Sequence, residues 1–177
     1  MFGFKFVCLA TLAAVLDAFV VPNWWRLQAT TVALVAHSVP VFGLSATTFG
    51  SSIAFADPEG MGFAYLVTPG CTAALPVFLY MAAVFAYPAA WKQRVYGLLY
   101  GVAFLLALNV LRLSSMAWIG MRFPDFFEEA HLSWWQASFI IAVAFTWWFW
   151  VQSLDPAKDR LRRRLPAFFS QLGLVSK

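Results

Sequence analysis

Three residues far apart in the sequence have the side chains that acyl transfer requires. Cys71 follows Pro69 and Gly70 at the start of an apolar segment, Arg112 interrupts a second apolar segment, and His131 directly precedes a third. An imidazole can activate a cysteine thiol as a nucleophile. A guanidinium can hold the oxyanion that develops when the nucleophile attacks a carbonyl. If the fold brings the three side chains together, they form a plausible acyl-transfer site.

Each of these residues also has an ordinary structural interpretation. A single cysteine in an apolar segment is usually a small filler, which is what we expect of Cys8. Arg112 could pair with Asp17 and so join two helices, which would suit a membrane scaffold without enzymatic activity. His131 could belong to a belt of interfacial aromatic residues. His37 is an alternative to His131 as the base.

Two neighbouring residues could support or bind substrate at such a site. Asn109 lies three residues before Arg112, on the same face of a helix, and Thr72 directly follows Cys71. A helix that began at Cys71 would favour the thiolate form of the cysteine. One cysteine and one histidine do not make a metal site. We therefore expect neither a metal nor another cofactor.

The composition indicates that these residues lie in a membrane protein. Of the 177 residues, 62% are apolar and 11% are charged, and there are 19 Phe and 9 Trp. Ordinary soluble domains are about 25% charged, and a soluble chain of this length has too little interior to bury so much apolar surface. The composition excludes a soluble globular enzyme, a disordered chain and a disulfide-stapled secreted module.

Hydropathy predicts an all-α integral membrane bundle with about four transmembrane helices, because each span needs about 20 mostly apolar residues. We expect these spans at about 4–23, 71–91, 95–121 and 132–154. The segment 27–49 carries apolar residues at helical spacing among Thr and Ser, which favours an amphipathic helix in the outer interface. The alternative is a fifth span. Residues 51–69 contain a Pro-Glu-Gly turn between short β-type runs, so we expect an extracytoplasmic β-hairpin before Cys71.

The charges predict the orientation of the chain. Residues 155–177 contain six basic and two acidic residues, which places the end of the last span in the cytoplasm. Lys92 and Arg94 then lie on the same side, and the acidic loop 122–131 lies outside. We expect one catalytic membrane domain at 1–155 and a basic cytoplasmic tail at 156–177 that contacts lipid but no nucleic acid. Cys71, Arg112 and His131 then converge near the outer leaflet.

Three short motifs resemble those of the exosortase/archaeosortase family. They are Thr68-Pro69-Gly70-Cys71-Thr72-Ala73, then Asn109-Val110-Leu111-Arg112 within a span, then His131 in the next outer loop. The resemblance covers roughly residues 30–152. Exosortases have a cysteine, an arginine and a histidine in this order on three consecutive spans. Many members have Ser-Gly after the cysteine, where this chain has Thr72 and Ala73.

The resemblance implies a cysteine transpeptidase of the bacterial cytoplasmic membrane, with its active site on the extracytoplasmic side. Its substrates would be exported proteins that end in a short motif, a transmembrane helix and a basic segment. Cys71 would form a thioester with the substrate, and an acceptor nucleophile that the sequence does not identify would resolve it. A substrate anchored by its own helix would present the scissile bond at a fixed depth.

Overall fold

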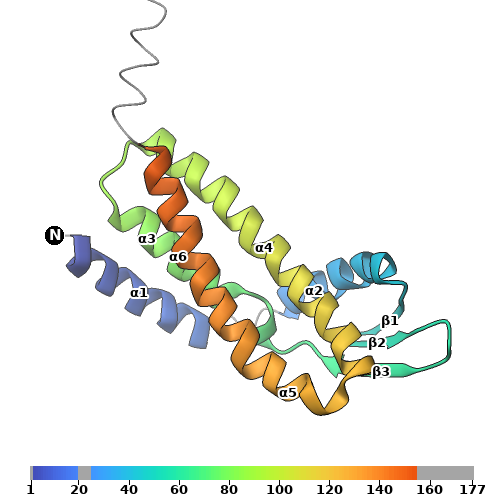
Figure 1. Ribbon diagram of the computed structural model, residues 1–177. Helices are drawn as coiled ribbons and strands as arrows, with labels where there is room; N and C mark the ends of the chain where they lie inside the picture. Colours follow the sequence, from blue (N-terminus) through green and yellow to red (C-terminus); the bar gives the residue numbers. More distant parts are fainter. Residues whose placement is uncertain (1, 20–24, 155–177) are drawn as a thin grey trace, which may run out of the picture.

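The computed structural model describes residues 2–19 and 25–154, and all structural statements below concern these residues. Two long helices, α4 and α6, run side by side, and a small sheet lies at the end where α4 finishes (Figure 1). The helices are α1 (Phe2–Phe19), α2 (Trp25–Ser38), α3 (Ala74–Ala86), α4 (Trp91–Arg122), α5 (Phe127–Glu129) and α6 (Trp135–Ser153). The strands are β1 (Ser45–Phe49), β2 (Ser52–Ala56) and β3 (Gly62–Leu66). The basic segment 156–177 and the end of the expected first span lie outside the described residues.

Three helical segments are long and apolar enough to cross a membrane: Phe2–Phe19, Trp91–Arg122 and Pro124–Ser153. The expectation of a mostly helical chain with helices that could cross a membrane is confirmed, whereas the expected number of four spans is not. The expected span at 71–91 is instead α3, which has 13 residues. It ends at Ala86 because Tyr87 precedes Pro88 and takes an extended conformation, as the residue before a proline commonly does.

The segment 27–49 is not one helix, which corrects the sequence-based expectation. The α-helix α2 ends at Ser38, and a 3₁₀ turn covers Val39–Phe42. Gly43 then adopts a left-handed conformation with φ of 75° and ends the helical stretch. The following residues form β1, so the sheet has three strands rather than the two of a hairpin. With 14 residues, α2 is also too short to be the alternative fifth span.

The sheet is an antiparallel meander in the order β1-β2-β3, and its second connection is the predicted hairpin. In that turn, Oδ1 of Asp57 accepts hydrogen bonds from the backbone amides of Glu59 at 3.0 Å and Met61 at 2.9 Å. Gly60 supplies the positive φ of 83° that the turn needs. Arg122, at the end of α4, pairs with Asp57 at 3.4 Å. The turn is therefore tied to the end of α4, one of the candidate membrane-spanning segments.

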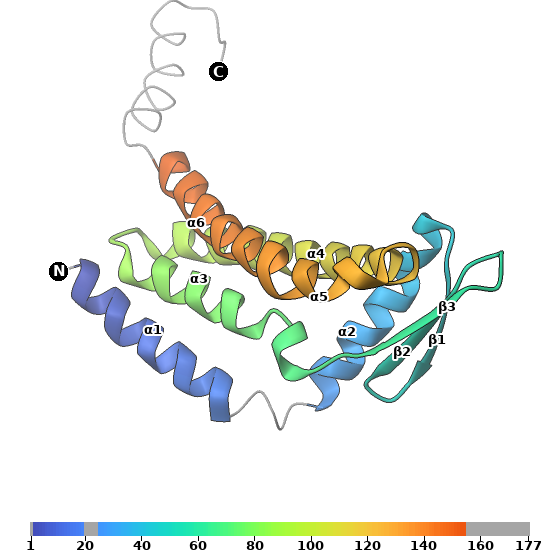
Figure 2. The same ribbon diagram turned by 60° about the horizontal axis from the view of Figure 1, so that its bottom comes forward.

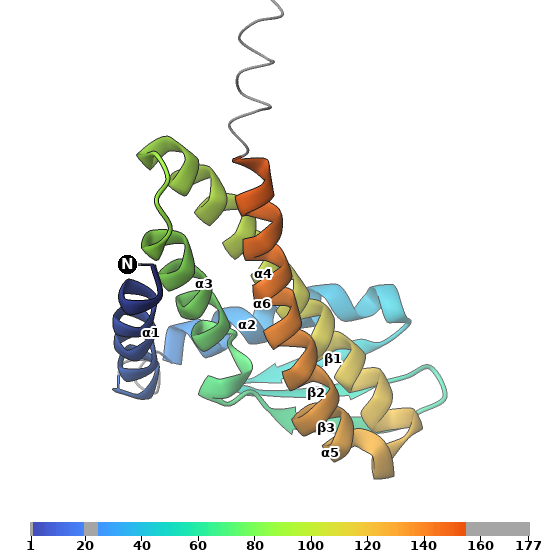
Figure 3. The ribbon, with the colours of Figure 1, turned by 60° about the vertical axis from the view of Figure 1, so that its left-hand side comes forward.

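The apolar interior has two parts, one at each end of the molecule. The sheet-side core joins α2, the sheet and the final turns of α4, with α2 crossing beside α4 (Figure 3). The helix core joins α3, α4 and α6 toward the other end, while α1 packs along α3 (Figure 2). Cys71 belongs to the sheet-side core and is 5% exposed. The helix core contains Tyr80, Val84, Leu105 and Trp150.

Two glycines of α4 allow the helix core to pack closely. A Cβ atom at Gly97 would overlap the indole of Trp150, and one at Gly101 would overlap the ring of Tyr80. Both rings are fixed by hydrogen bonds: Tyr80 Oη donates to the Gly97 carbonyl at 2.8 Å, and Trp150 Nε1 donates to the Gln93 carbonyl at 3.1 Å. Neither ring can move aside without losing its hydrogen bond.

Gly101→Ala is therefore expected to lower the free energy of unfolding by about 3 kcal/mol, the upper end of the usual cost of overpacking. Gly3→Ala is the matched control, because no atom of the described part of the chain lies within 4 Å of the position of its added Cβ. That variant should be neutral or slightly stabilising, since alanine favours a helix over glycine. Thermal unfolding of the two variants in the same detergent compares them. Equal midpoints would contradict the packing of Tyr80 against α4.

Candidate active site

A tight turn between β3 and α3 positions Cys71. The Cys71 amide donates to the Thr68 carbonyl at 2.9 Å, and the Thr72 hydroxyl donates to the Pro69 carbonyl at 2.7 Å. From α4, Nδ2 of Asn109 donates to the Cys71 carbonyl at 2.7 Å. Asn109 and Thr72 are both buried at 2% exposure. They hold the backbone of the turn and do not line the cavities beside the thiol.

Cys71 does not begin an α-helix, contrary to the expectation from sequence. It closes the 3₁₀ turn Pro69–Cys71, and α3 starts three residues later at Ala74. Between them, Ala73 has a left-handed backbone with φ of 59°, which costs a non-glycine residue roughly 1–2 kcal/mol. A glycine at this position would adopt the same conformation without that cost.

Arg112 points from the middle of α4 toward α6. Its guanidinium carbon lies 5.6 Å from the centroid of the Phe139 ring, a cation–π contact. Its buried Nε has no hydrogen-bond partner among the described residues. The same holds for Nε of Arg94, Nε1 of Trp147 and Oδ1 of Asn109, so this feature is not specific to Arg112. Arg112 is also one of the residues that line the cavity described below.

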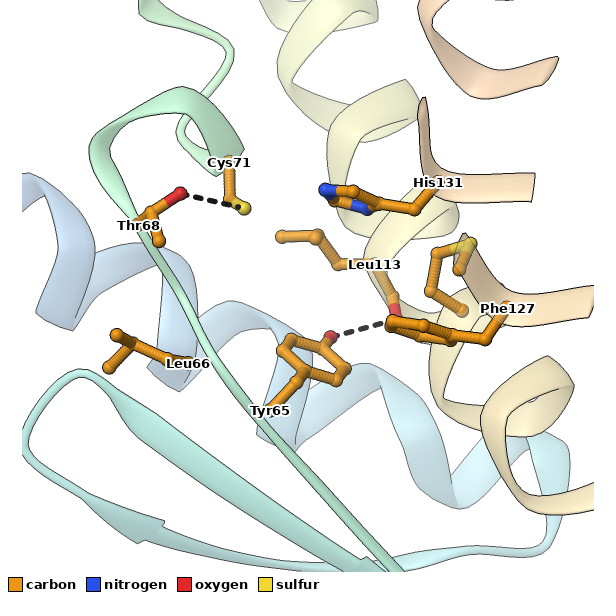
Figure 4. Close-up of a pocket in the computed structure, with 8 residues that line it drawn as sticks. Tyr65, Leu66, Thr68, Cys71, Leu113, Phe127 and His131 are labelled. Atoms are coloured by element: carbon orange, nitrogen blue, oxygen red, sulfur yellow. Dashed lines mark hydrogen bonds between the residues drawn. The ribbon is translucent and has the colours of Figure 1, made fainter. Parts of the chain in front are cut away.

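His131 lies in a π-helical turn, Ala130–Trp134, between α5 and α6. Such turns are rare and often occur at functional sites. The imidazole stacks on the Phe127 ring, with centroids 6.0 Å apart and planes inclined by 6°. It faces the sulfur of Cys71 across a small gap (Figure 4). The π-helical turn thus directs a titratable side chain toward the thiol.

A cavity of about 510 Å³ brings the three sequence-predicted residues together. Cys71, Arg112 and His131 all line it. Its remaining walls are mostly apolar residues of α3 and α6, among them Leu75, Leu79, Phe139, Ile140 and Val143. The cavity therefore has reactive groups at one end and apolar helix surfaces along its sides.

Asp17 also lines this cavity, but it forms no ion pair with Arg112 among the described residues. The described residues therefore do not contain the Asp17–Arg112 ion pair that would join two helices. His37 is exposed and bonds the Ala33 carbonyl within α2, and it lines neither cavity beside Cys71. Cys8 is exposed on α1 rather than packed in a core.

A second cavity, of about 110 Å³, lies on the sheet side of the thiol. Thr68, Cys71 and His131 line both cavities. Tyr65 and Phe127 help to close the smaller one, as Figure 4 shows. The thiol and the imidazole thus stand at the boundary between a large, mainly apolar cavity and a small one.

Sequence reasoning missed two polar residues beside the thiol. Thr68 shares a hydrogen bond with Sγ of Cys71 at 3.4 Å, and Tyr65 donates from its hydroxyl to the Leu113 carbonyl at 2.9 Å. Burial raises the pKa of Tyr65 well above its ordinary value, and the nearby Cys71 raises it further, while Arg112 lowers it. The phenol is therefore a neutral hydrogen-bond donor. Thr68 lies three residues before the cysteine, and this spacing could have indicated that its hydroxyl lies near the thiol.

The arrangement offers a nucleophile, a base and an oxyanion donor at one end of a cavity large enough for a peptide segment. That set of groups is suited to acyl transfer. Comparison with known proteins adds no further assignment: no family model, curated protein or solved structure matches the chain.

Proposed function

We propose that this chain is an exosortase-like cysteine transpeptidase of the bacterial cytoplasmic membrane. The observation that supports the proposal is the shared cavity, which joins Cys71, Arg112 and His131 although they come from three separate segments. The order of these residues along the chain matches that of the exosortase motifs. The three candidate membrane-spanning segments fit an enzyme that acts within the bilayer.

In the proposed reaction, Cys71, His131 and Arg112 each act once in the formation of the thioester and once in its resolution. His131 takes the proton of the Cys71 thiol, and the sulfur attacks the carbonyl carbon of the scissile peptide bond. Arg112, which lines the same cavity, holds the developing oxyanion with its guanidinium. The C–N bond then breaks, and His131 returns the proton to the departing amine. The product is a thioester on Cys71, which an acceptor nucleophile resolves by the same steps in reverse order.

The substrates proposed are exported proteins that end in a short motif, a transmembrane helix and a basic segment. The apolar walls of the large cavity, formed by residues such as Leu75 and Ile140, support this proposal because they suit a chain that continues into lipid. The substrate's own anchor would hold the scissile bond near the thiol, which removes much of the orientational search.

The distribution of charge supports an orientation with the site on the extracytoplasmic side. Lys92 and Arg94 lie at the end of the helices opposite the sheet, and the basic segment 156–177 follows the end of α6. The turn of the sheet carries Asp57 and Glu59, and the start of the last helical segment is acidic. Basic residues concentrate on the cytoplasmic side of membrane proteins.

Trapping the covalent intermediate tests the proposal. The full chain is reconstituted in vesicles with an exported protein from the same genome that ends in a hydrophobic span and an arginine-rich segment. Rapid acid quenching and peptide mass mapping should find the truncated substrate on Cys71, in a linkage that hydroxylamine cleaves, as expected of a thioester. A substrate that is processed while Cys71 stays unmodified, or that is attached elsewhere, would overturn the mechanism. Intact substrate after long incubation with several such proteins would overturn the function.

A further inference from the structure

Cys71 and His131 border two cavities of very different size, and a transpeptidase must admit two different reactants. The larger cavity, of about 510 Å³, contains Arg112 and extends between α3 and α6. The smaller, of about 110 Å³, lies against the end of β3 and contains neither Arg112 nor Asp17. The two cavities share Thr68, Cys71 and His131. A carbonyl carbon attached to Cys71 Sγ could therefore be approached from either side.

Resting on the proposed transpeptidase function, we propose that the small cavity is the entry site for the second nucleophile, and that this nucleophile is an unbranched primary amine. The acyl chain then remains in the large cavity while the amine reaches the thioester from the sheet side. This assigns separate sites to the acyl donor and the acceptor, with the thiol and the imidazole between them.

Size restricts the acceptor. An apolar cavity of about 150 Å³ holds a benzene molecule, so 110 Å³ holds about four non-hydrogen atoms. The reacting end of the acceptor must then be a thin chain without branches near the nitrogen. A second polypeptide could enter only by the end of a side chain, and a bulky or branched amine would be excluded.

The chemistry of the walls restricts the acceptor further. Leu66, Leu113, Met116 and Phe127 supply apolar surface, and Tyr65 and Thr68 supply hydroxyl groups near the thiol. None of the described residues that line this cavity is a carboxylate, a lysine or an arginine. Such walls are better suited to a methylene chain than to water molecules, and they offer no counter-ion to a permanently charged group. The amine therefore reacts in its neutral form.

The bond changes in this step balance without any other reagent. The amine lone pair attacks the thioester carbonyl carbon, and a C–N bond forms. The C–S bond breaks, and its electron pair stays on the sulfur of Cys71. The proton lost by the nitrogen passes to His131, which borders both cavities and can return it to the sulfur. The products are an amide and the free thiol.

Two exposed leucines on opposite sides of the thiol give a matched pair of variants. Leu66 lines the small cavity and is 56% exposed, and Leu75 lines the large cavity and is 37% exposed. Tryptophan at either position fills space in one cavity without replacing a residue of the buried core. The full chain in phosphatidylcholine vesicles is given para-nitrophenyl octanoate as acyl donor and n-propylamine as acceptor. Release of nitrophenol reports acylation of Cys71, and N-propyl octanamide reports transfer.

We expect Leu66→Trp to keep the rate of nitrophenol release in the first turnover and to lower amide formation by about tenfold, with acyl-enzyme accumulating. Leu75→Trp should instead lower the first-turnover rate and leave the ratio of amide to octanoate unchanged. Leu66→Ala should admit isobutylamine, which the unmodified chain excludes. If both tryptophan variants lose both acylation and amide formation, the assignment of the two cavities is overturned. It is also overturned if substitution of Leu75, rather than of Leu66, changes which amines react.

The same experiment separates failure of this inference from failure of the proposed function. If the unmodified chain releases no more nitrophenol than its Cys71→Ala variant, both are overturned. If it is acylated on Cys71 but tert-butylamine reacts as well as n-propylamine, only the cavity assignment is overturned. Adding phosphatidylethanolamine to the vesicles tests the source of the amine: an octanoylated lipid supports a membrane acceptor, and n-propyl amide alone supports a soluble one.

Discussion

Cys71→Ala is expected to abolish the proposed processing of a sorting-signal substrate, with a loss of at least about 10³-fold, because none of the other described residues that line the two cavities carries a thiol. Cys71, the proposed nucleophile, lines both cavities. The cavity created by removing one sulfur atom from this buried site is small, so the folded protein should still accumulate. The measurement is the size of the substrate in cells and in reconstituted vesicles.

Cys8→Ala is the matched control for this experiment, since it removes the same atom from an exposed position on α1. Its processing rate should stay within about twofold of the unmodified chain, as expected for a surface substitution. Processing that continues unchanged in Cys71→Ala, at an equal amount of folded protein, would show that the thiol is not the nucleophile. Equal losses in both variants would point to a general effect of thiol removal.

Arg112→Lys is expected to lower the rate of acylation by about 10²-fold, the usual effect of removing one oxyanion donor. Lysine keeps the positive charge but loses the planar arrangement of guanidinium donors. It also loses the stacking of the guanidinium over Phe139. Substrate binding through the apolar walls should change little, so the loss should appear in kcat more than in KM.

Arg122→Lys makes the same substitution at the far end of α4, where Arg122 pairs with Asp57 at 3.4 Å and Glu59 at 3.5 Å. That pair is partly exposed, so its loss should cost at most about 1 kcal/mol of stability and leave acylation unchanged. Near-normal acylation by Arg112→Lys would exclude a role that needs the guanidinium geometry. A strong coupling between Arg112→Ala and Asp17→Ala in a stability cycle would instead favour the scaffold interpretation.

The meeting of Cys71, Arg112 and His131 could be predicted from the sequence because topology alone constrains it. Neighbouring helices joined by short links run in opposite directions, so the start of α3, the later half of α4 and the start of the last helical segment share one side. The hairpin before Cys71 was also predictable, because Asp57-Pro58-Glu59-Gly60 contains the residues that tight turns need. Both expectations depend on local patterns and chain direction rather than on side-chain packing.

The errors arose where one pattern continued past a structural boundary. Apolar residues at helical spacing extend from Val32 to Phe42, but the α-helix ends at Ser38, and Gly43 precedes a strand. The uncharged run from Cys71 to Trp91 hides a left-handed Ala73 at one end and an extended Tyr87 at the other. Hydropathy carries no information on backbone conformation, so the lengths predicted from it for both helices were too long.

The residues that complete the site could not be found from sequence for a different reason. Phe139 contacts Arg112, and Tyr65 and Phe127 close the small cavity. These contacts join segments that are far apart in the sequence and share no repeating pattern. Such contacts depend on how α4, α6 and β3 pack in three dimensions. The π-helical turn at His131 is likewise invisible to a pattern of period 3.6.

The shortness of α3 bears on where the proposed reaction would take place. Thirteen residues of α-helix span about 20 Å, whereas the hydrocarbon layer of a bilayer is about 30 Å thick. With the carboxyl end of α3 at one boundary of that layer, as the proposed orientation has it, the start of α3 would lie inside the layer. A substrate drawn into the layer by its own anchor would reach that level, so the length of α3 would set the depth at which the proposed enzyme acts.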